Sequence, residues 1–159
     1  MSTTPTVNGQ VIGQAHYASR AVLERVLART GTTFHQSLAL NATAGSGEAI
    51  GREQLVARMT GALKIDSATA LAVIAELTGA ALLETVPGDG RGAGGGDGLR
   101  LTDAGQALNR EIRAAAAEIA ARLYDGFSAD ELATAGRLLT VVTARANAEL
   151  AAGQEVAAR

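Results

Sequence analysis

The chain contains no cysteine and very few aromatic residues. The absence of cysteine excludes disulfide bonds, thiol catalysis and zinc ribbons. Aromatic residues make up 3% of the 159 residues and apolar residues 47%, so the core must be built from Leu, Val, Ile and Ala. This length and composition predict one domain, residues 1–159, with a substantial core.

The sequence also lacks enzyme motifs. It has no G-x-S-x-G, no H-E-x-x-H and no paired acids at an obvious cleft. Its two histidines lie without carboxylate or thiol neighbours, so no zinc site is expected. We therefore expect no enzyme, no catalytic residues, no metal and no cofactor.

Nothing in the sequence predicts secretion or membrane insertion. The first ten residues have neither a basic segment nor an apolar run, so no signal peptide is expected. The most apolar stretch, residues 68–83, is interrupted by Glu76 and is shorter than the roughly 20 residues that span a bilayer. The formal net charge of −2 gives no overall attraction to nucleic acid. We expect a cytoplasmic protein without membrane contact.

The first half of the chain has helical periodicity. Apolar residues spaced three and four apart predict a first helix over residues 8–30. Thr33 and Gln36 form a capping box for a second helix to about residue 40, followed by a surface loop over residues 41–50. A third helix is expected over about 51–60. A fourth is expected to end near residue 78, with Asp66 or Ser67 as its N-cap.

Two short strands and two long helices are expected in the second half. Residues 81–86 and 98–102 favour strands that pair with each other. Thr102 is the expected cap of a helix over 103–124, and Ser128 with Glu131 forms a capping box for a last helix to about residue 151. Both long helices carry an apolar stripe, which predicts a dimer seam or, as the alternative, the core of a monomer.

The stretch between the two strands contains seven glycines in the eleven residues 88–98. Its G-x-G-x-x-G spacing does not open a helix, as a dinucleotide-binding loop must, and no Gly-Lys-Ser/Thr follows for a P-loop. Glycine accepts the positive φ angles of hairpin turns. We therefore interpret residues 86–102 as a β-hairpin wing with Arg91 as the cation at its tip.

Three short sequence motifs accompany this order of helices and strands. Asp89-Gly90-Arg91 matches a D-x-R motif in a wing, and "LTDAG", residues 101–105, matches an L-T-x-x-G motif that closes the wing and begins a long helix. "ELTGAALLETV", residues 76–86, lies where a leucine, a turn and "GLV" are expected. On these residues, over about 10–150, the chain resembles the MarR family of bacterial transcription regulators.

The resemblance implies a mainly α fold with a small β-hairpin wing. Residues 33–102 would form the winged helix-turn-helix, and the helices over 8–30 and 103–151 would interlock in a homodimer. It also implies a DNA-binding regulator, a repressor, that recognises a palindromic operator and is released by a small aromatic or phenolic ligand.

The expected DNA-binding residues are few in number. The recognition helix, residues 67–77, contains no Lys or Arg, and residues 51–102 hold five basic against six acidic groups. Beyond Ser67 and Thr69 it offers only the methyl groups of Ala68 and Ala72, which can touch thymine.

The wing lacks the usual second arginine, Ala72 stands where relatives often have a basic residue, and Ala81 replaces the usual glycine. The DNA-binding prediction comprises Arg52, Lys64, Ser67, Thr69, Arg91 and Arg100.

Alternatives apply to some of these residues. Ser67 can equally be only a helix cap, and Arg58 is expected on a solvated helix face or in an ion pair rather than at DNA. A positive stripe formed by Arg52, Lys64, Arg91 and Arg100 would favour DNA binding. Neutralisation by Asp66, Asp89 and Asp97 would favour a MarR-like dimer that has lost DNA recognition and acts as a ligand-sensing or protein-interaction module.

A ligand site is predicted at the first two helices. His16 and Arg20 lie four residues apart on one helical face bordered by Tyr17, and His35 begins the next helix. An imidazole, a guanidinium and a phenol suit an aromatic carboxylate. The structural alternatives are an Arg20–Glu24 ion pair and a place for Tyr17 in the dimer core.

Overall fold

The computed structural model describes residues 6–87 and 97–157. The chain divides into two compact units, Met1–Ala120 and Ala121–Arg159. No helix in the described part of the chain is long and apolar enough to cross a membrane.

The first unit contains four helices followed by the beginning of a fifth. Asn8 caps the first helix by accepting hydrogen bonds from the amides of Gln10 and Val11, and Gly31 ends it with a φ of 66°. The Thr33–Gln36 capping box is present in both directions, at 2.9 and 3.2 Å. The helices are α1 (Gly9–Thr30), α2 (Phe34–Ala44), α3 (Arg52–Leu63), α4 (Ser67–Gly79) and α5 (Asp103–Leu123).

A three-stranded antiparallel sheet completes this unit. Its strands are β1 (Ile50–Gly51), β2 (Leu83–Val86) and β3 (Gly98–Leu101), with β3 in the centre. Leu83 pairs with Leu101, and both side chains are buried, while the Glu84–Arg100 pair lies on the opposite face. The predicted pairing of the two wing strands is therefore confirmed.

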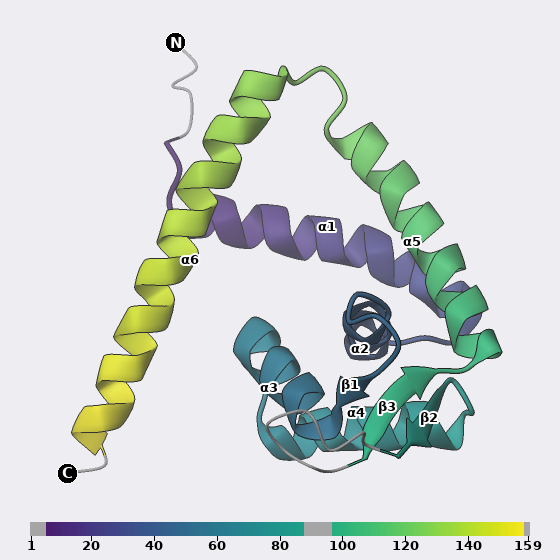
Figure 1. Ribbon diagram of the computed structural model, residues 1–159. Coiled ribbons are helices and arrows are strands. Elements are labelled where there is room, and N and C mark those ends of the chain that lie inside the picture. The colour runs from purple at the N-terminus through teal and green to yellow at the C-terminus, as the bar shows by residue number, and fades with distance from the viewer. Residues whose placement is uncertain (1–5, 88–96, 158–159) are drawn as a thin grey trace. The chain divides into compact units, whose positions relative to one another are not determined.

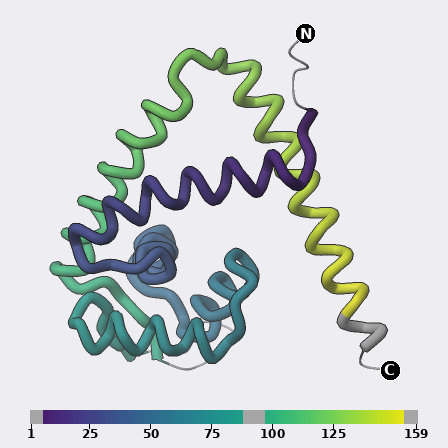
Figure 2. The backbone as a smooth tube through the Cα atoms, turned by 180° about the vertical axis from the view of Figure 1, so that it is seen from behind, coloured from purple at the N-terminus to yellow at the C-terminus, as the bar shows by residue number. Residues whose placement is uncertain are grey.

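The core of the first unit is aliphatic, as expected. Figure 1 shows α2 end-on between α1 and α4, with the sheet beside α4, and Figure 2 shows the same arrangement from behind. Leucine and isoleucine from every one of these elements fill the space between them. The most deeply buried of these side chains are Leu27, Leu40, Ile50, Leu55, Ile74, Leu77, Leu83 and Leu99.

The second unit consists of the end of α5, a turn and helix α6 (Ala129–Ala157). The predicted capping box is present: the Ser128 amide donates to Glu131 Oε2 at 2.8 Å, and the Glu131 amide donates to Ser128 Oγ at 3.3 Å. The Ser128 amide, and the Ser128 hydroxyl that donates to the same Glu131 oxygen at 2.7 Å, hold the pKa of Glu131 below its usual value. Helix α6 extends six residues beyond the predicted end at residue 151.

Several predicted boundaries were wrong. Helix α2 continues to Ala44, so the predicted loop begins four residues too early, and α3 continues to Leu63 instead of stopping at residue 60. Strand β1 was not predicted at all. The predicted start of α4 is confirmed in one of its two alternatives: Asp66 is the N-cap, because its side chain accepts from the Thr69 amide at 2.6 Å.

Candidate nucleic-acid interface

The α3–α4 pair forms the helix-turn-helix, and a three-residue turn joins its members. Lys64 ends α3 in the left-handed region, with a φ of 56°, and its exposed ammonium group donates to the Gly61 carbonyl. Asp66 then begins α4. Lys64 therefore lies just before α4, and its positive charge also interacts with the C-terminal carbonyl groups of α3.

Asp66 places a negative charge at the start of α4. The Thr69 amide and hydroxyl hold the pKa of Asp66 below its usual value. Ser67 is the first helical residue and is exposed, and Thr69 is half-buried. Ser67 is therefore free of the capping role that was its alternative.

Helix α4 exposes apolar groups on the side opposite its core face. Its buried residues are Ala70, Val73, Ile74 and Leu77. Its exposed side chains include Ala68, Leu71, Ala72 and Ala75, and Leu71 is 44% exposed. Leu71 is absent from the predicted DNA-binding residues, although its place outside the buried stripe at 70, 73, 74 and 77 would have predicted its exposure.

Arg52 lies next to the sheet at the base of the wing. It begins α3 directly after Gly51, which pairs with Gly98 of β3. Its side chain is half-buried and makes no ion pair with the described part of the chain. Arg52 can therefore reach an anion beside β3.

Arg100 is not a free cation. Its Nε donates to Glu84 Oε1 at 2.9 Å, and its Nη2 donates to the same oxygen at 2.6 Å, across the β2–β3 ladder. Cross-strand partners share a face of the sheet, so the pairing register brings these two groups together. Glu84 thus partly neutralises the predicted positive stripe, and it was not among the acids predicted to do so.

The remaining wing residues and Arg58 complete this surface. Arg91, together with Asp89, lies outside the described residues. Arg58 forms no ion pair with the described residues and lies on a solvated helix face, which was the other predicted alternative. It is exposed and donates to Ser46 Oγ at 2.8 Å, beside the last turn of α2.

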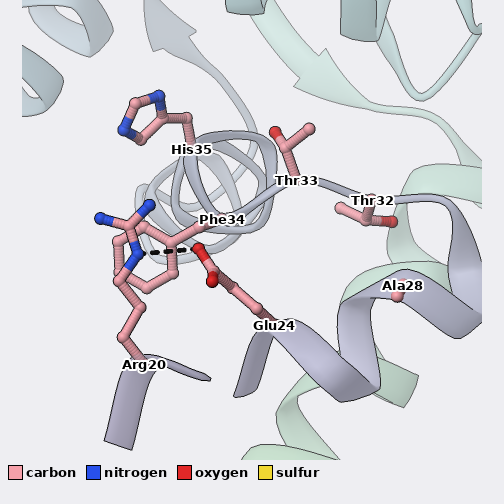
Figure 3. A pocket seen from close by; sticks show the side chains of 7 residues that line it. All are labelled: Arg20, Glu24, Ala28, Thr32, Thr33, Phe34 and His35. Carbon is pink, nitrogen blue, oxygen red and sulfur yellow. Dashed lines mark hydrogen bonds and ion pairs between the residues drawn. The ribbon is translucent and has the colours of Figure 1, made fainter. Parts of the chain in front are cut away.

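A second candidate site is an open pocket of about 280 Å³ in the first unit, between α1 and α2. Figure 3 shows the guanidinium of Arg20 over the ring of Phe34, and the distance from Arg20 Cζ to the ring centroid is 4.5 Å. Arg20 Nε also donates to Glu24 Oε1 at 2.8 Å, which confirms the predicted ion pair. The pocket is lined by Arg20, Glu24, Ala28, Thr32, Thr33, Phe34 and His35.

Only two of the four predicted ligand residues line this pocket. Arg20 and His35 do so, whereas His16 and Tyr17 do not. Tyr17 is 70% exposed and lies edge-on to the His16 ring, with 5.4 Å between centroids. Phe34 and Glu24 were missed as lining residues. The scarcity of aromatic residues was the signal that could have selected Phe34.

The second unit has an extensive exposed apolar surface. Every side chain of α6 over residues 129–153 is exposed. The large apolar residues among them are Leu132, Leu138, Leu139, Val141, Val142 and Leu150. Side chains of this kind normally need a partner surface.

No group of three or more His, Cys, Asp or Glu side chains gathers at a potential metal site within residues 6–87 and 97–157.

Comparisons with known proteins show where this arrangement recurs. No protein-family model matches the chain, and no curated protein sequence matches it. Solved structures do. MarR from E. coli in its apo form aligns with a TM-score of 0.65 and 20% identity, covering 87% of this chain and 98% of that chain.

Two further structures extend the match. CouR from Rhodococcus jostii RHA1, bound to p-coumaroyl-CoA, aligns with a TM-score of 0.69 and 12% identity, covering 85% of this chain and 90% of that one. A MarR-family transcriptional regulator from Silicibacter pomeroyi gives 0.67 and 16%, covering 85% and 86%. The chain therefore has the fold of the MarR-family winged helix-turn-helix regulators, as the sequence predicted.

Proposed function

We propose that the protein is a homodimeric, DNA-binding transcription regulator of MarR type that acts as a cytoplasmic repressor. The observation that carries this proposal is the fold, which similar structures of known regulators share over 85–87% of the chain. In this proposal α4 enters the major groove of a palindromic operator, and the wing contacts the adjacent backbone.

The DNA-binding groups proposed are Arg52, Lys64, Ser67, Thr69, Arg91 and Arg100. Arg52 and Lys64 are the positive groups near the two ends of α3, and Ser67 begins the recognition helix. This set neutralises few phosphates, so the affinity for DNA should depend only weakly on salt. The logarithm of the binding constant should fall by about 0.9 for each tenfold rise in salt concentration and each phosphate contacted.

The dimer is proposed to form through the helices over residues 8–30 and 103–151. The exposed leucine and valine side chains of α6 support this, because an unpartnered apolar row of that length would be exposed to water in a monomer. The double variant Leu139→Glu/Val142→Glu should yield a monomer in light scattering, whereas Arg145→Glu on the same helix should remain a dimer. A dimer that tolerates the double change would contradict the proposed seam.

The α1–α2 pocket is proposed to hold a small aromatic carboxylate. Glu24 bonds only the Nε of Arg20, so the two terminal amino groups of that guanidinium can bind a carboxylate bidentately. The Phe34 ring supplies an apolar wall. Benzoate and 4-hydroxybenzoate are suitable calorimetric probes, and Arg20→Gln should abolish a binding that Arg29→Gln retains.

The test of the proposed function is a search for its operator. Selection from random duplex DNA with the full chain, and fluorescence anisotropy on DNA upstream of its own gene, should reveal a palindrome that binds more tightly than scrambled DNA. Lys64→Ala and Arg91→Ala should weaken that binding at both low and high salt. The matched variant Arg145→Ala, which removes a cation from α6, should not. Failure to select any sequence would contradict DNA recognition.

A MarR-like dimer that senses a ligand or binds a protein is the second candidate. The observations that favour it are the ion pair of Arg100 with Glu84 and the negative cap Asp66 beside Lys64. The operator selection separates the two candidates, because only the first predicts an enriched DNA sequence.

A further inference from the structure

The exposed stripe of α4 lies directly opposite the stripe that anchors this helix in the core. The buried residues occupy positions 70, 73, 74 and 77, and the exposed apolar residues occupy 68, 71, 72 and 75. Each set follows the spacing of one helical face, and a displacement of two residues turns the helix by about 200°. The exposed stripe therefore points away from the core, toward whatever this helix contacts.

The chemistry of this stripe is unusual for a recognition helix. Bases are commonly recognised by Arg, Lys, Asn or Gln, which pair with their hydrogen-bonding edges. Residues 67–79 contain none of these four residue types. The acid of this helix, Glu76, accepts a hydrogen bond from Gln36 Nε2 of α2 at 2.9 Å. The stripe thus offers methyl groups, with Ser67 at its beginning.

The major groove presents one apolar group to such a surface, the C5-methyl of thymine. We propose that α4 recognises its operator mainly through thymine methyl groups, with Leu71 as the specificity-determining residue and Ala68 and Ala72 beside it. This inference rests on the proposed function and adds the feature of the DNA that the helix selects.

The position of Leu71 suits this role. The N-terminal residues of a recognition helix contact the base edges, and Leu71 lies one turn after Ser67. It is the one large apolar side chain exposed on α4 in the described structure, at 44%. The small side chains of Ala68 and Ala72 on either side allow the helix to approach the floor of the groove closely.

The test removes the methyl group from the DNA. The operator selected with the full-length protein is prepared with thymine replaced by uracil, one position at a time in each half-site, and its affinity is measured by anisotropy. At one or two positions per half-site the affinity should fall about fourfold. This is the factor expected when the burial of one methyl group is lost from the complex. Leu71→Ala should lower the affinity for the thymine operator and abolish the difference between thymine and uracil.

Two variants control for indirect effects. Leu71→Met keeps an apolar side chain of similar volume and should retain the preference for thymine. Val7→Ala shortens an exposed apolar side chain that precedes α1, outside the proposed dimer helices, and should change neither affinity nor preference. Thermal denaturation of each variant verifies that it is folded.

The outcomes separate this inference from the proposed function. Specific binding that is indifferent to uracil, or a thymine preference that survives in Leu71→Ala, would overturn the inference and leave the proposed regulator intact. If selection yields no DNA sequence, both are overturned, and the apolar stripe is left to a protein partner.

Discussion

Gly105 of α5 lies against the backbone of Leu82. A Cβ atom at Gly105 would overlap the Leu82 carbonyl oxygen and lie 3.0 Å from its carbonyl carbon. The residues around this contact reinforce it. The Thr102 amide donates to the same Leu82 oxygen at 3.2 Å, and the Thr102 hydroxyl donates to the Ala81 carbonyl at 2.7 Å. The "LTDAG" segment therefore attaches the start of α5 to the turn between α4 and β2.

This contact makes Gly105→Ala a severe change. The added methyl group meets backbone, which cannot rotate away, so we expect a loss of about 3 kcal/mol in the free energy of unfolding. The matched variant is Gly61→Ala on α3, where a Cβ would meet nothing within 4 Å. It should raise stability by about 0.5–1 kcal/mol. Urea denaturation measures both, and equal effects at the two sites would contradict the proposed close approach.

Ala81 adopts a conformation that suits glycine. Its φ is 55°, in the left-handed region, and the Leu82 amide donates to the Leu77 carbonyl at 2.9 Å, as at a helix C-terminus closed by a Schellman motif. The sequence places alanine here, where the MarR resemblance implied glycine.

We therefore expect Ala81→Gly to stabilise the protein by about 0.5–1 kcal/mol, because the relief of strain exceeds the entropy gained by the unfolded chain. Ala80→Gly is the control, since Ala80 has a φ of −81° and no strain to relieve. That change should be destabilising. Melting temperatures that shift in the same direction for both variants would show that the conformation of Ala81 carries no strain.

Features fixed by neighbours in sequence were predictable, and those that depend on distant contacts were not. The Thr33–Gln36 and Ser128–Glu131 capping boxes each lie within four residues and were found correctly. The extension of α2 was missed because Asn41 and Thr43 are weak helix formers. Thr43 is only 2% exposed, and its hydroxyl donates to the Ala39 carbonyl at 2.9 Å, so burial outweighs propensity there.

The same limit applied to the sites. Strand β1 has two residues and exists only through its pairing with β3, which no local pattern indicates. The α1–α2 pocket brings Arg20 to Phe34 and His35 across a turn, whereas helical spacing alone had grouped Arg20 with His16. The Glu84–Arg100 ion pair required the strand register, which the glycine-rich segment between the strands left undetermined.

That ion pair predicts an unusual effect of removing an acid. Glu84→Gln should free Arg100 and raise DNA affinity about two- to fivefold, the range of one exposed ion pair. The slope of the logarithm of the binding constant against the logarithm of the salt concentration should become steeper by about 0.9, which corresponds to one further phosphate contact. Glu118→Gln on α5 removes the same charge elsewhere and should have no such effect.

A double-mutant cycle locates the origin of this gain. Arg100→Ala should cost more affinity in the Glu84→Gln background than in the wild-type background, because the guanidinium binds phosphate more strongly once it no longer shares its charge with Glu84. Equal losses in the two backgrounds would mean that Glu84 acts through its charge alone.

Asp66 couples the stability of helix α4 to pH. Its folded pKa lies below the usual value of 3.8 because the Thr69 amide and hydroxyl donate to the carboxylate. A depressed pKa contributes stability that is present above the unfolded pKa and is lost as the pH falls through the folded one. Asp66→Asn should therefore be less stable than wild type at pH 7, and the difference should shrink as the pH falls below about 4.

In the proposed complex the same variant should bind DNA more tightly at pH 7, because it removes a negative charge beside Lys64 at the start of α4. Glu131→Gln is the matched control. Glu131 is also an exposed capping acid with a lowered pKa, but it lies in the second unit, at the start of α6. Like Asp66→Asn, the Glu131→Gln variant should be less stable than wild type at pH 7, and the difference should shrink as the pH falls. Unlike Asp66→Asn, it should not gain affinity for DNA. Chemical denaturation between pH 3 and pH 7 (roughly spanning the carboxylate titration) and anisotropy at pH 7 measure the two effects. A gain in affinity for both variants would show that net charge, rather than the position of Asp66, controls binding.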